Sequence, residues 1–357
     1  MAATKNVQMA RTPSRSGLLR RVAFGLVRLA IGVGILVYLV KSGQIELRSL
    51  TRLLHAWPLT VLGVGAFLVD IFFMSIRASL LFHAQRLSLS LRNAIQLTLI
   101  GFFFSTFLPG AAGGDIAKLY YAARENYGKR VEVATVLLFD RIIGLFSLVL
   151  LPFLFVPFFL ELLVRVPILR HILWFDGALG LAMILGMTLV MFSESFRMRS
   201  SRLLARWLGA QNIAERAFEA ICAYGKGRSV LLPALALSLA ANLVLIASTA
   251  FGLYAVNPAG LSMKLCLVAP IGHLANSLPL TPGGIGVGES AFNALFSLTG
   301  ISGGADALLC LRVWSLLVGT LGLIDYVFGV GRIVHWQEEH PGADRPRSFE
   351  DSSIEIS

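Results

Sequence analysis

The sequence predicts an all-α polytopic membrane protein with six full spans and two re-entrant broken segments that form an inverted repeat. Hydrophobic residues make up 56% of the 357 residues and charged residues only 14%, and the mean hydropathy is +0.75. A soluble core of this size does not need so much apolar surface. Several apolar runs are long enough to cross a bilayer, and two shorter runs end in breaks rich in proline and glycine.

Six apolar runs are expected to be full spans. The first follows a basic N-terminal tail, residues 1–21, which the positive-inside rule places in the cytoplasm. No small-residue cleavage site follows this run, so we expect a retained span; a mitochondrial presequence is the alternative for the tail. The expected spans are 22–40, 57–82, 133–159, 172–192, 231–256 and 307–330.

The most informative stretch is Leu278–Glu289, which reads LPLTPGGIGVGE. Its prolines and glycines cannot continue a helix. Broken backbone at membrane depth is tolerated only where protein buries it or where it lines a wet cavity. Phe107–Asp115, FLPGAAGGD, has the same Leu-Pro followed by Gly-Gly. The residues expected to form gating loops are Pro109, Gly113, Gly114, Pro279, Pro282, Gly283, Gly284 and Gly286.

The two breaks fall at matching places in two halves of the chain. Pro279 follows Pro109 by 170 residues, the Gly-Gly pairs keep that offset, and Arg312 follows Arg141 by 171. Paired broken segments of this kind point to the substrate site of a transporter. Chance is the alternative, and close helix packing is a second explanation for the glycine pairs.

The two short runs, 93–108 and 265–281, decide the topology. If both cross fully there are eight spans, and segment 193–229 with its seven Lys and Arg residues lies outside. If both re-enter, 83–130 and 193–229 are cytoplasmic, as the positive-inside rule requires. Six spans are therefore favoured over eight, and both arrangements place the two termini in the cytoplasm.

The basic segment 193–229 has apolar residues at helical spacing, which suits an amphipathic helix on the anionic leaflet, with a soluble connector helix as the alternative. Residues 332–357 carry three Arg against six acidic residues and are expected to form a disordered cytoplasmic tail. The expected division of the chain is thus a tail at 1–21, a transmembrane domain at 22–331 and a second tail at 332–357.

Charged residues inside the apolar runs are expected to share one polar cavity, because one charge at the bilayer centre costs about 3 kcal/mol. Guanidinium groups suit phosphate, whereas carboxylates suit an amine or a proton. Asp70 stands two turns from Arg77 on one helix face, and a structural ion pair is the alternative there, as it is for Asp140 with Arg141. The expected substrate-binding residues are Arg77, Asp115, Lys118, Asp140, Arg141, Glu289 and Arg312.

Other functional classes find little support. The net charge is +11, but the basic residues lie between apolar runs rather than in one patch, so cytoplasmic loops and anionic lipids explain them better than nucleic acid does. Three separated cysteines and six scattered histidines predict no disulfide framework and no metal site. No serine-hydrolase or phosphate-loop motif is present, and no cofactor is expected.

Four segments together resemble the transmembrane region of lysylphosphatidylglycerol synthases, a flippase-like domain that also occurs as stand-alone proteins. They are FLPGAAGGDIAKLY, FDRIIGL, PLTPGGIGVGE and LRVWSLLVG, and the resemblance covers residues 20–332. Proteins of that family commonly carry Arg where Gly288 precedes Glu289 here. In bifunctional members a soluble aminoacyltransferase domain follows; this chain leaves no room for one and is not expected to synthesise lysylphosphatidylglycerol.

The resemblance implies translocation of a phospholipid or another polar lipid between the leaflets of the bacterial inner membrane, without ATP hydrolysis by the protein. Arg141 and Arg312 are then expected to hold the phosphate, and Asp115 and Glu289 a cationic headgroup or a coupling proton. Expected partners are anionic or amine-bearing phospholipids, a second copy of the chain or a lipid-synthesising enzyme. The alternatives are a lipid-modifying or glycosyl-transferring membrane enzyme, since some archaeal relatives are described as glycosyltransferases, and a structural subunit or receptor.

Overall fold

The computed structural model describes residues 55–107, 113–193, 230–278 and 286–339, with residues 200, 216, 218–222 and 224 between them. Every regular element in these ranges is a helix, as predicted. Five helices contain an apolar stretch long enough to cross a membrane, so the chain is a polytopic membrane protein. They are α3 (Trp57–Ala84), α6 (Arg130–Phe155), α8 (Pro167–Phe192), α11 (Leu231–Val256) and α14 (Gly304–Glu339).

Five of the six predicted spans are therefore present. The predicted first span at 22–40, the basic tail before it and most of the predicted amphipathic helix at 193–229 lie outside the described residues. The predicted C-terminal tail begins too early, because α14 continues to Glu339. The chain has neither glycine nor proline between Arg332 and Pro341 to end the helix sooner. The rest of that tail lies outside the described residues.

Each predicted break separates two short helices that pack against each other. The first pair, α4 (Leu91–Phe107) and α5 (Gly113–Glu125), is named the first hairpin; the second pair, α12 (Leu265–Ser277) and α13 (Val287–Leu298), the second hairpin. Paired short helices of this kind are what the re-entrant prediction leads one to expect. The two tips, 108–112 and 279–285, are outside the described residues, and with them five predicted gating residues, namely Pro109, Pro279, Pro282, Gly283 and Gly284.

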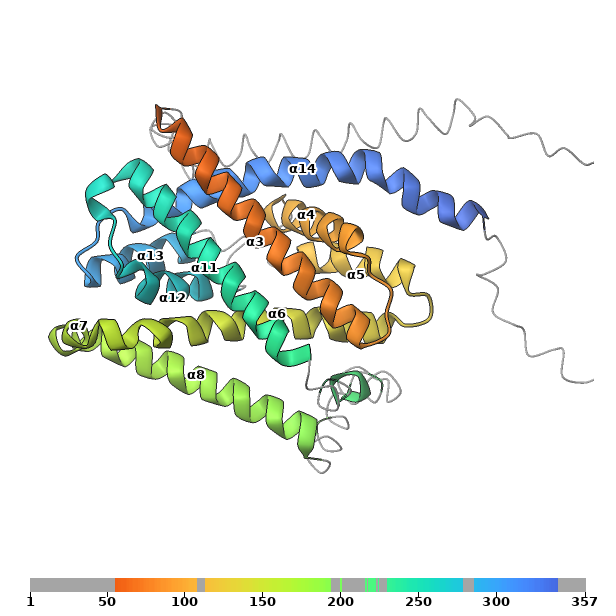
Figure 1. The fold of residues 1–357 in the computed structure, drawn as a ribbon, viewed down its shortest axis with the longest axis horizontal. Coiled ribbons are helices and arrows are strands. Elements are labelled where there is room, and N and C mark those ends of the chain that lie inside the picture. The colour runs from red at the N-terminus through yellow and green to blue at the C-terminus, as the bar shows by residue number, and fades with distance from the viewer. Residues whose placement is uncertain are drawn as a thin grey trace, which may run out of the picture.

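The hairpins enter the helix bundle from opposite ends. Helices α3 and α11 lie antiparallel, because Ser248 of α11 donates a hydrogen bond to the carbonyl of Gly63 near the start of α3, whereas Arg77 near the end of α3 donates to Ser238. The first hairpin follows α3 and the second follows α11, so the two hairpins begin at opposite ends of the bundle. Figure 1 shows the first hairpin at the right and the second at the left.

The packing of the two halves repeats with exchanged partners. Helix α4 of the first half packs against α14 of the second, and α12 of the second half packs against α6 of the first. The long helices α3 and α11, which precede the two hairpins, pack against each other. Each element thus has a counterpart: α3 with α11, α4 with α12, α5 with α13 and α6 with α14. This exchange is what two inverted repeats produce when they share one interior.

Side chains close the base of each hairpin. At the first, the amide of Asn126 accepts the backbone N–H of Ser88 at 2.8 Å and donates to its carbonyl at 2.9 Å, which joins the turn after α3 to the turn before α6. At the second, Lys264 donates to the carbonyl of Thr299 at 2.8 Å, and Gly300 has a φ of 77° that favours glycine. Both hairpins are therefore fixed at the base.

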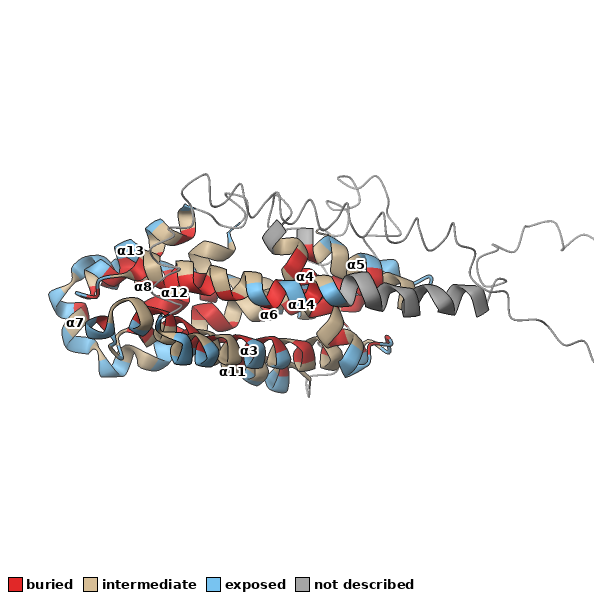
Figure 2. Ribbon diagram, turned by 90° about the horizontal axis from the view of Figure 1, so that it is seen from above, coloured by how far each residue is buried: buried red, intermediate tan, exposed pale blue. Residues whose placement is uncertain are grey.

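The surface of the bundle is apolar, as a lipid-facing surface must be. Helix α8 is the clearest case, since Trp174 is 73% and Phe175 is 75% exposed; Figure 2 shows exposed positions along the outer sides of the helices and buried ones between them. Helix α8 also carries one acidic side chain, Asp176. It is buried, and neither of its carboxylate oxygens has a hydrogen-bond partner.

Candidate functional site

A cavity of about 450 Å³ lies between the hairpins and the long helices. This volume falls within the range of small-molecule pockets. Its lining comes from both halves of the repeat: α3 to α6 from the first, α11 to α14 from the second. All seven residues predicted to bind the substrate border it, namely Arg77, Asp115, Lys118, Asp140, Arg141, Glu289 and Arg312.

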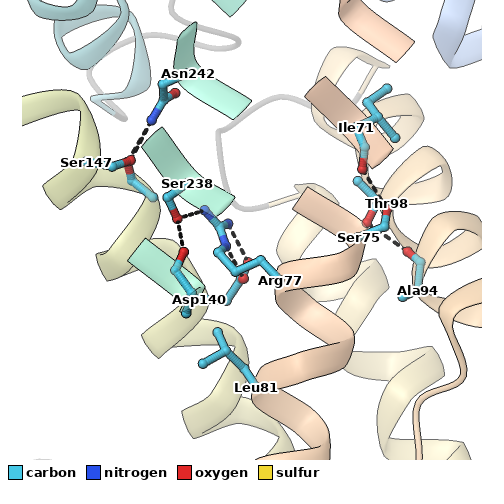
Figure 3. Close-up of polar contacts among 12 residues, drawn as sticks. Ile71, Ser75, Arg77, Leu81, Ala94, Thr98, Asp140, Ser147, Ser238 and Asn242 are labelled. Atoms are coloured by element: carbon cyan, nitrogen blue, oxygen red, sulfur yellow. Dashed lines mark hydrogen bonds and ion pairs between the residues drawn. The ribbon is translucent and has the colours of Figure 1, made fainter. Parts of the chain in front are cut away.

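Arg77 and Asp140 form a buried ion pair at one side of the cavity. The guanidinium donates from Nε to Oδ1 at 2.7 Å and from Nη2 to Oδ2 at 3.0 Å, and its Nη1 donates to Ser238 at 2.7 Å (Figure 3). This fork-to-fork geometry uses both carboxylate oxygens and joins α3, α6 and α11. The spacing in the sequence had suggested an ion pair between Arg77 and Asp70 as one alternative. The structure instead pairs Arg77 with Asp140 of another helix. The pair is neutral and satisfied, which suits a structural role.

The first hairpin brings an acid to the cavity at the start of its second helix. Asp115 is the third residue of α5 and is paired with Arg141 of α6, whose Nη1 donates to Oδ2. A carboxylate in the first turn of a helix also benefits from the unpaired N–H groups there. The side chains are 35% exposed for Arg141 and 47% for Asp115, so the pair is only half buried and makes this single contact.

The second hairpin repeats the arrangement with more contacts. Glu289 is the third residue of α13, and Arg312 of α14 donates to it from Nε at 2.5 Å and from Nη2 at 3.2 Å. Glu289 also accepts the backbone N–H of Gly286 at 2.7 Å, a capping-box contact. Arg312 donates further to Asn276 of α12 at 3.2 Å. Both members of the ion pair are only 20% exposed.

A glycine precedes each acid because the two helices of each hairpin approach closely there. A Cβ on Gly114 would lie 2.1 Å from the Ser105 hydroxyl and 2.3 Å from the Gly101 carbonyl oxygen of α4. A Cβ on Gly288 would lie 2.2 Å from Asn276 Oδ1. One of the predicted gating glycines, Gly114, thus has a packing role, and Gly113 is the first residue of α5. Gly286, with a φ of 83°, is the N-cap of α13.

Two more charged groups line the cavity without an ion-pair partner. Asp70, at the middle of α3, is 4% exposed, and Lys118 extends from α5 with its stem against Gly101 of α4. Among the described residues, neither forms a hydrogen bond or an ion pair. The sequence pattern singled out Lys118 for the site, whereas it placed Asp70 only as a neighbour of Arg77.

Polar groups on α11 and α12 complete the lining. Asn242 donates to Ser147 of α6 at 2.5 Å (Figure 3), and His273 shares a hydrogen bond of 2.9 Å with Thr249. The sequence signal for these residues, and for Asn276, was an isolated polar side chain in an apolar run, which does not tell a cavity from a helix contact. In all, the lining has four cationic and four acidic side chains among many apolar ones.

The family comparison agrees with this architecture. The model of the lysylphosphatidylglycerol synthase transmembrane region matches residues 25–323, which is most of the chain. The chain belongs to this family. Neither a curated protein nor a solved structure matches it. Membership of a lysylphosphatidylglycerol synthase transmembrane-region family implies a membrane protein of lipid metabolism or transport, in keeping with a polytopic bundle that encloses a charged cavity.

Gly288 stands next to Glu289 at a crowded point of the second hairpin. Asn276 and Leu308 fill the space that a side chain at 288 would enter. Asn276 uses that space to contact Arg312. Arg312 is thus the guanidinium that meets Glu289 at the border of the cavity.

Proposed function

We propose that this protein translocates a phospholipid or another polar lipid between the leaflets of the bacterial inner membrane, with both termini in the cytoplasm. One observation carries the proposal: two hairpins that enter from opposite ends each bring an acid to the same cavity, where an arginine of the following long helix pairs with it. An inverted repeat with broken segments around one central site suits alternating access from the two sides. The family assignment supports a role with lipids.

The acid–arginine pairs provide a way to handle a charged headgroup inside a bilayer. A free headgroup charge in the hydrocarbon core is costly. A phosphate that enters the cavity replaces the carboxylate as the acceptor of an arginine fork, and an amine replaces the arginine as the donor to that carboxylate. In this mechanism Arg141 and Arg312 contact phosphate, while Asp115 and Glu289 contact a cationic headgroup or carry a coupling proton.

The hairpins are the moving parts in this mechanism. Their tips contain the predicted gating prolines and glycines, whereas Asn126 and Lys264 hold their bases. Motion about a fixed base changes which side of the membrane reaches the cavity. Arg77 and Asp140, which tie three long helices together, belong to the stationary frame.

Reconstitution tests the proposal. Proteoliposomes that contain a trace of acyl-chain-fluorescent phospholipid report translocation when dithionite, which does not cross the bilayer, quenches the outer leaflet. The wild type should make label in the inner leaflet accessible, and Arg312→Ala and Glu289→Ala should abolish this. Arg165→Ala is the matched control, because it removes an exposed acid–arginine pair with Glu161, away from the cavity.

Two results would contradict the proposal. Wild-type translocation rates in both Arg312→Ala and Glu289→Ala would show that this ion pair is not part of the translocation site. Conversion of a lipid to a new product in detergent, where there are no leaflets, would show a membrane enzyme instead. A membrane-fraction assay that follows the mass of added lipids distinguishes this second result from translocation.

A further inference from the structure

The three arginines of the cavity are already occupied by carboxylates. Arg77 is held by Asp140, Arg141 by Asp115 and Arg312 by Glu289. Each pair is formally neutral, so the unsatisfied charge in the lining resides elsewhere. Asp70 and Lys118 are the two charged cavity residues that, among the described residues, lack such a partner.

Asp70 is the stronger of these two observations. It sits at the middle of α3, 4% exposed, and borders the cavity. A buried carboxylate without a donor is costly, because it loses its water without any replacement. Phe67, one turn earlier on α3, and Phe102 of α4 are its apolar neighbours in the cavity lining. A ligand that brings N–H donors to this carboxylate removes the cost, and no arginine in the described part of the chain does so.

Lys118 supplies the opposite charge from the other side. Its stem packs on Gly101 of α4, where the lack of a Cβ leaves room for it, and its ammonium group reaches the cavity. Asp115 and Asp140 are the acids that act on it electrostatically, but each of them is bonded to an arginine. An ammonium group is a compact phosphate ligand.

We propose that Asp70 and Lys118 select a lipid headgroup that carries both a phosphate and a primary ammonium and is neutral overall. The inference rests on the proposed translocation and specifies its cargo. Lys118 adds a contact to the phosphate beside those of the arginines, and Asp70 accepts hydrogen bonds from the ammonium, which leaves Asp115 and Glu289 to their arginines or to a coupling proton. Asp70 and Lys118 form no ion pair with each other, so both remain available to a ligand that spans them.

The charge of the lining supports a neutral headgroup. Four cationic side chains stand against four acidic ones, so the formal charges cancel. A headgroup with net negative or net positive charge would leave one uncompensated charge in the cavity. A primary ammonium is favoured over a quaternary one because the oxygens of Asp70 need N–H donors, which a quaternary nitrogen lacks.

The test compares three acyl-chain-fluorescent lipids in the same proteoliposomes: phosphatidylethanolamine, phosphatidylcholine and phosphatidylglycerol. The wild type should move phosphatidylethanolamine about tenfold faster than either of the others, the size expected from one charge-assisted hydrogen bond. Asp70→Asn should slow phosphatidylethanolamine about tenfold and reverse the preference toward phosphatidylglycerol, because the lining gains one positive charge. Lys118→Gln should slow both phosphatidylethanolamine and phosphatidylglycerol, because each carries the phosphate that Lys118 contacts.

Two further variants separate charge from folding. Asp70→Glu keeps the carboxylate and should keep the preference for phosphatidylethanolamine. Asp176→Asn removes another buried, unpartnered carboxylate that is outside the cavity, and should leave all three rates unchanged. Equal wild-type rates for phosphatidylethanolamine and phosphatidylglycerol, or equal slowing of all lipids by Asp70→Asn, would overturn this inference alone. A wild type that moves none of the lipids would overturn the proposed function itself.

Discussion

The two hairpins have the same plan but differ in how firmly each holds its ion pair. In both, the acid is the third residue of the second helix, a glycine precedes it, and an arginine on the next long helix is its partner. In the first hairpin the arginine makes one contact and the pair is half buried. In the second, two guanidinium nitrogens, a backbone N–H and the Asn276 amide hold the pair.

This difference indicates that the two ion pairs, although they occupy matching positions in the repeat, have different roles. The second pair has most of its hydrogen-bonding capacity filled by protein, so a ligand must displace several bonds to enter. The first pair has free capacity, and its acid, Asp115, lies on the same helix as Lys118. We therefore expect the first hairpin to exchange partners more easily, and the second to act as the firmer gate.

The largest contrast should come from the glycines. Gly114→Ala places a methyl group against the backbone carbonyl of Gly101, which cannot rotate away, and should cost about 3 kcal/mol of stability. Gly288→Ala meets the Asn276 and Leu308 side chains, which can move, and should cost about 1 kcal/mol. Titration of detergent-solubilised protein with dodecyl sulfate, followed by circular dichroism, measures both free energies of unfolding.

Gly186→Ala is the control for helix propensity, because no atom lies within 4 Å of a Cβ at that position. It should be neutral or slightly stabilising. Equal losses for Gly114→Ala and Gly288→Ala would show that the close approach at the first hairpin is no more rigid than that at the second, and would remove this part of the comparison.

The second contrast concerns the coupling of each ion pair. A double-mutant cycle of Glu289→Gln and Arg312→Gln should give a coupling energy of about 2 kcal/mol, because charge-assisted bonds in a mostly buried site are strong. The cycle of Asp115→Asn and Arg141→Gln should give less than about 1 kcal/mol, as expected for half-exposed pairs. The same dodecyl sulfate titration supplies the energies. A larger coupling at the first hairpin would reverse the assignment of the firmer gate.

The sequence predicted the elements of both hairpins but not their register. The prolines and Gly-Gly pairs repeat at 170 residues, whereas the structure equates Gly114 with Gly288 and Asp115 with Glu289, both at 174. The breaks are visible in sequence because proline and glycine end helices wherever they occur. The register depends on where the second helix of each hairpin restarts, and that is set by packing against the first helix.

The cavity residues show the same division between what pattern reveals and what packing decides. Charges inside apolar runs must turn inward, so the sequence alone placed Arg77 and Asp140 at one site. Lys118 was added because it stands close to Asp115 in the sequence. Which charges pair is a matter of helix arrangement. Arg77 bonds Asp140 sixty-three positions away rather than its neighbour Asp70, and only this arrangement leaves Asp70 open to the cavity.

The third contrast uses Asn276, whose side chain fills the space beside Gly288. Its counterpart beside Gly114 is Ser105, but there the Gly101 carbonyl fills the space as well. Asn276→Ala removes one hydrogen bond to Arg312 and should cost about 1 kcal/mol. It also frees the space above Gly288, so the double variant Asn276→Ala/Gly288→Ala should lose less than the two single losses together. Ser105→Ala should not rescue Gly114→Ala in this way, because the Gly101 carbonyl remains. Losses that add in full for Asn276→Ala and Gly288→Ala would contradict the prediction for the second hairpin.

The smallest contrast is the response to salt. Coulombic attraction between exposed charges is screened over about 3 Å at 1 M salt and about 10 Å at 0.1 M, whereas buried pairs are screened much less. The Asp115–Arg141 coupling should therefore fall by about 0.5 kcal/mol over that range, and the Glu289–Arg312 coupling should stay constant, because its members are 20% exposed against 35% and 47% for the first pair. Repeating both double-mutant cycles at the two salt concentrations measures this. If the second pair lost coupling as readily as the first, water would have to reach both pairs equally, and the two hairpins would be equivalent gates after all.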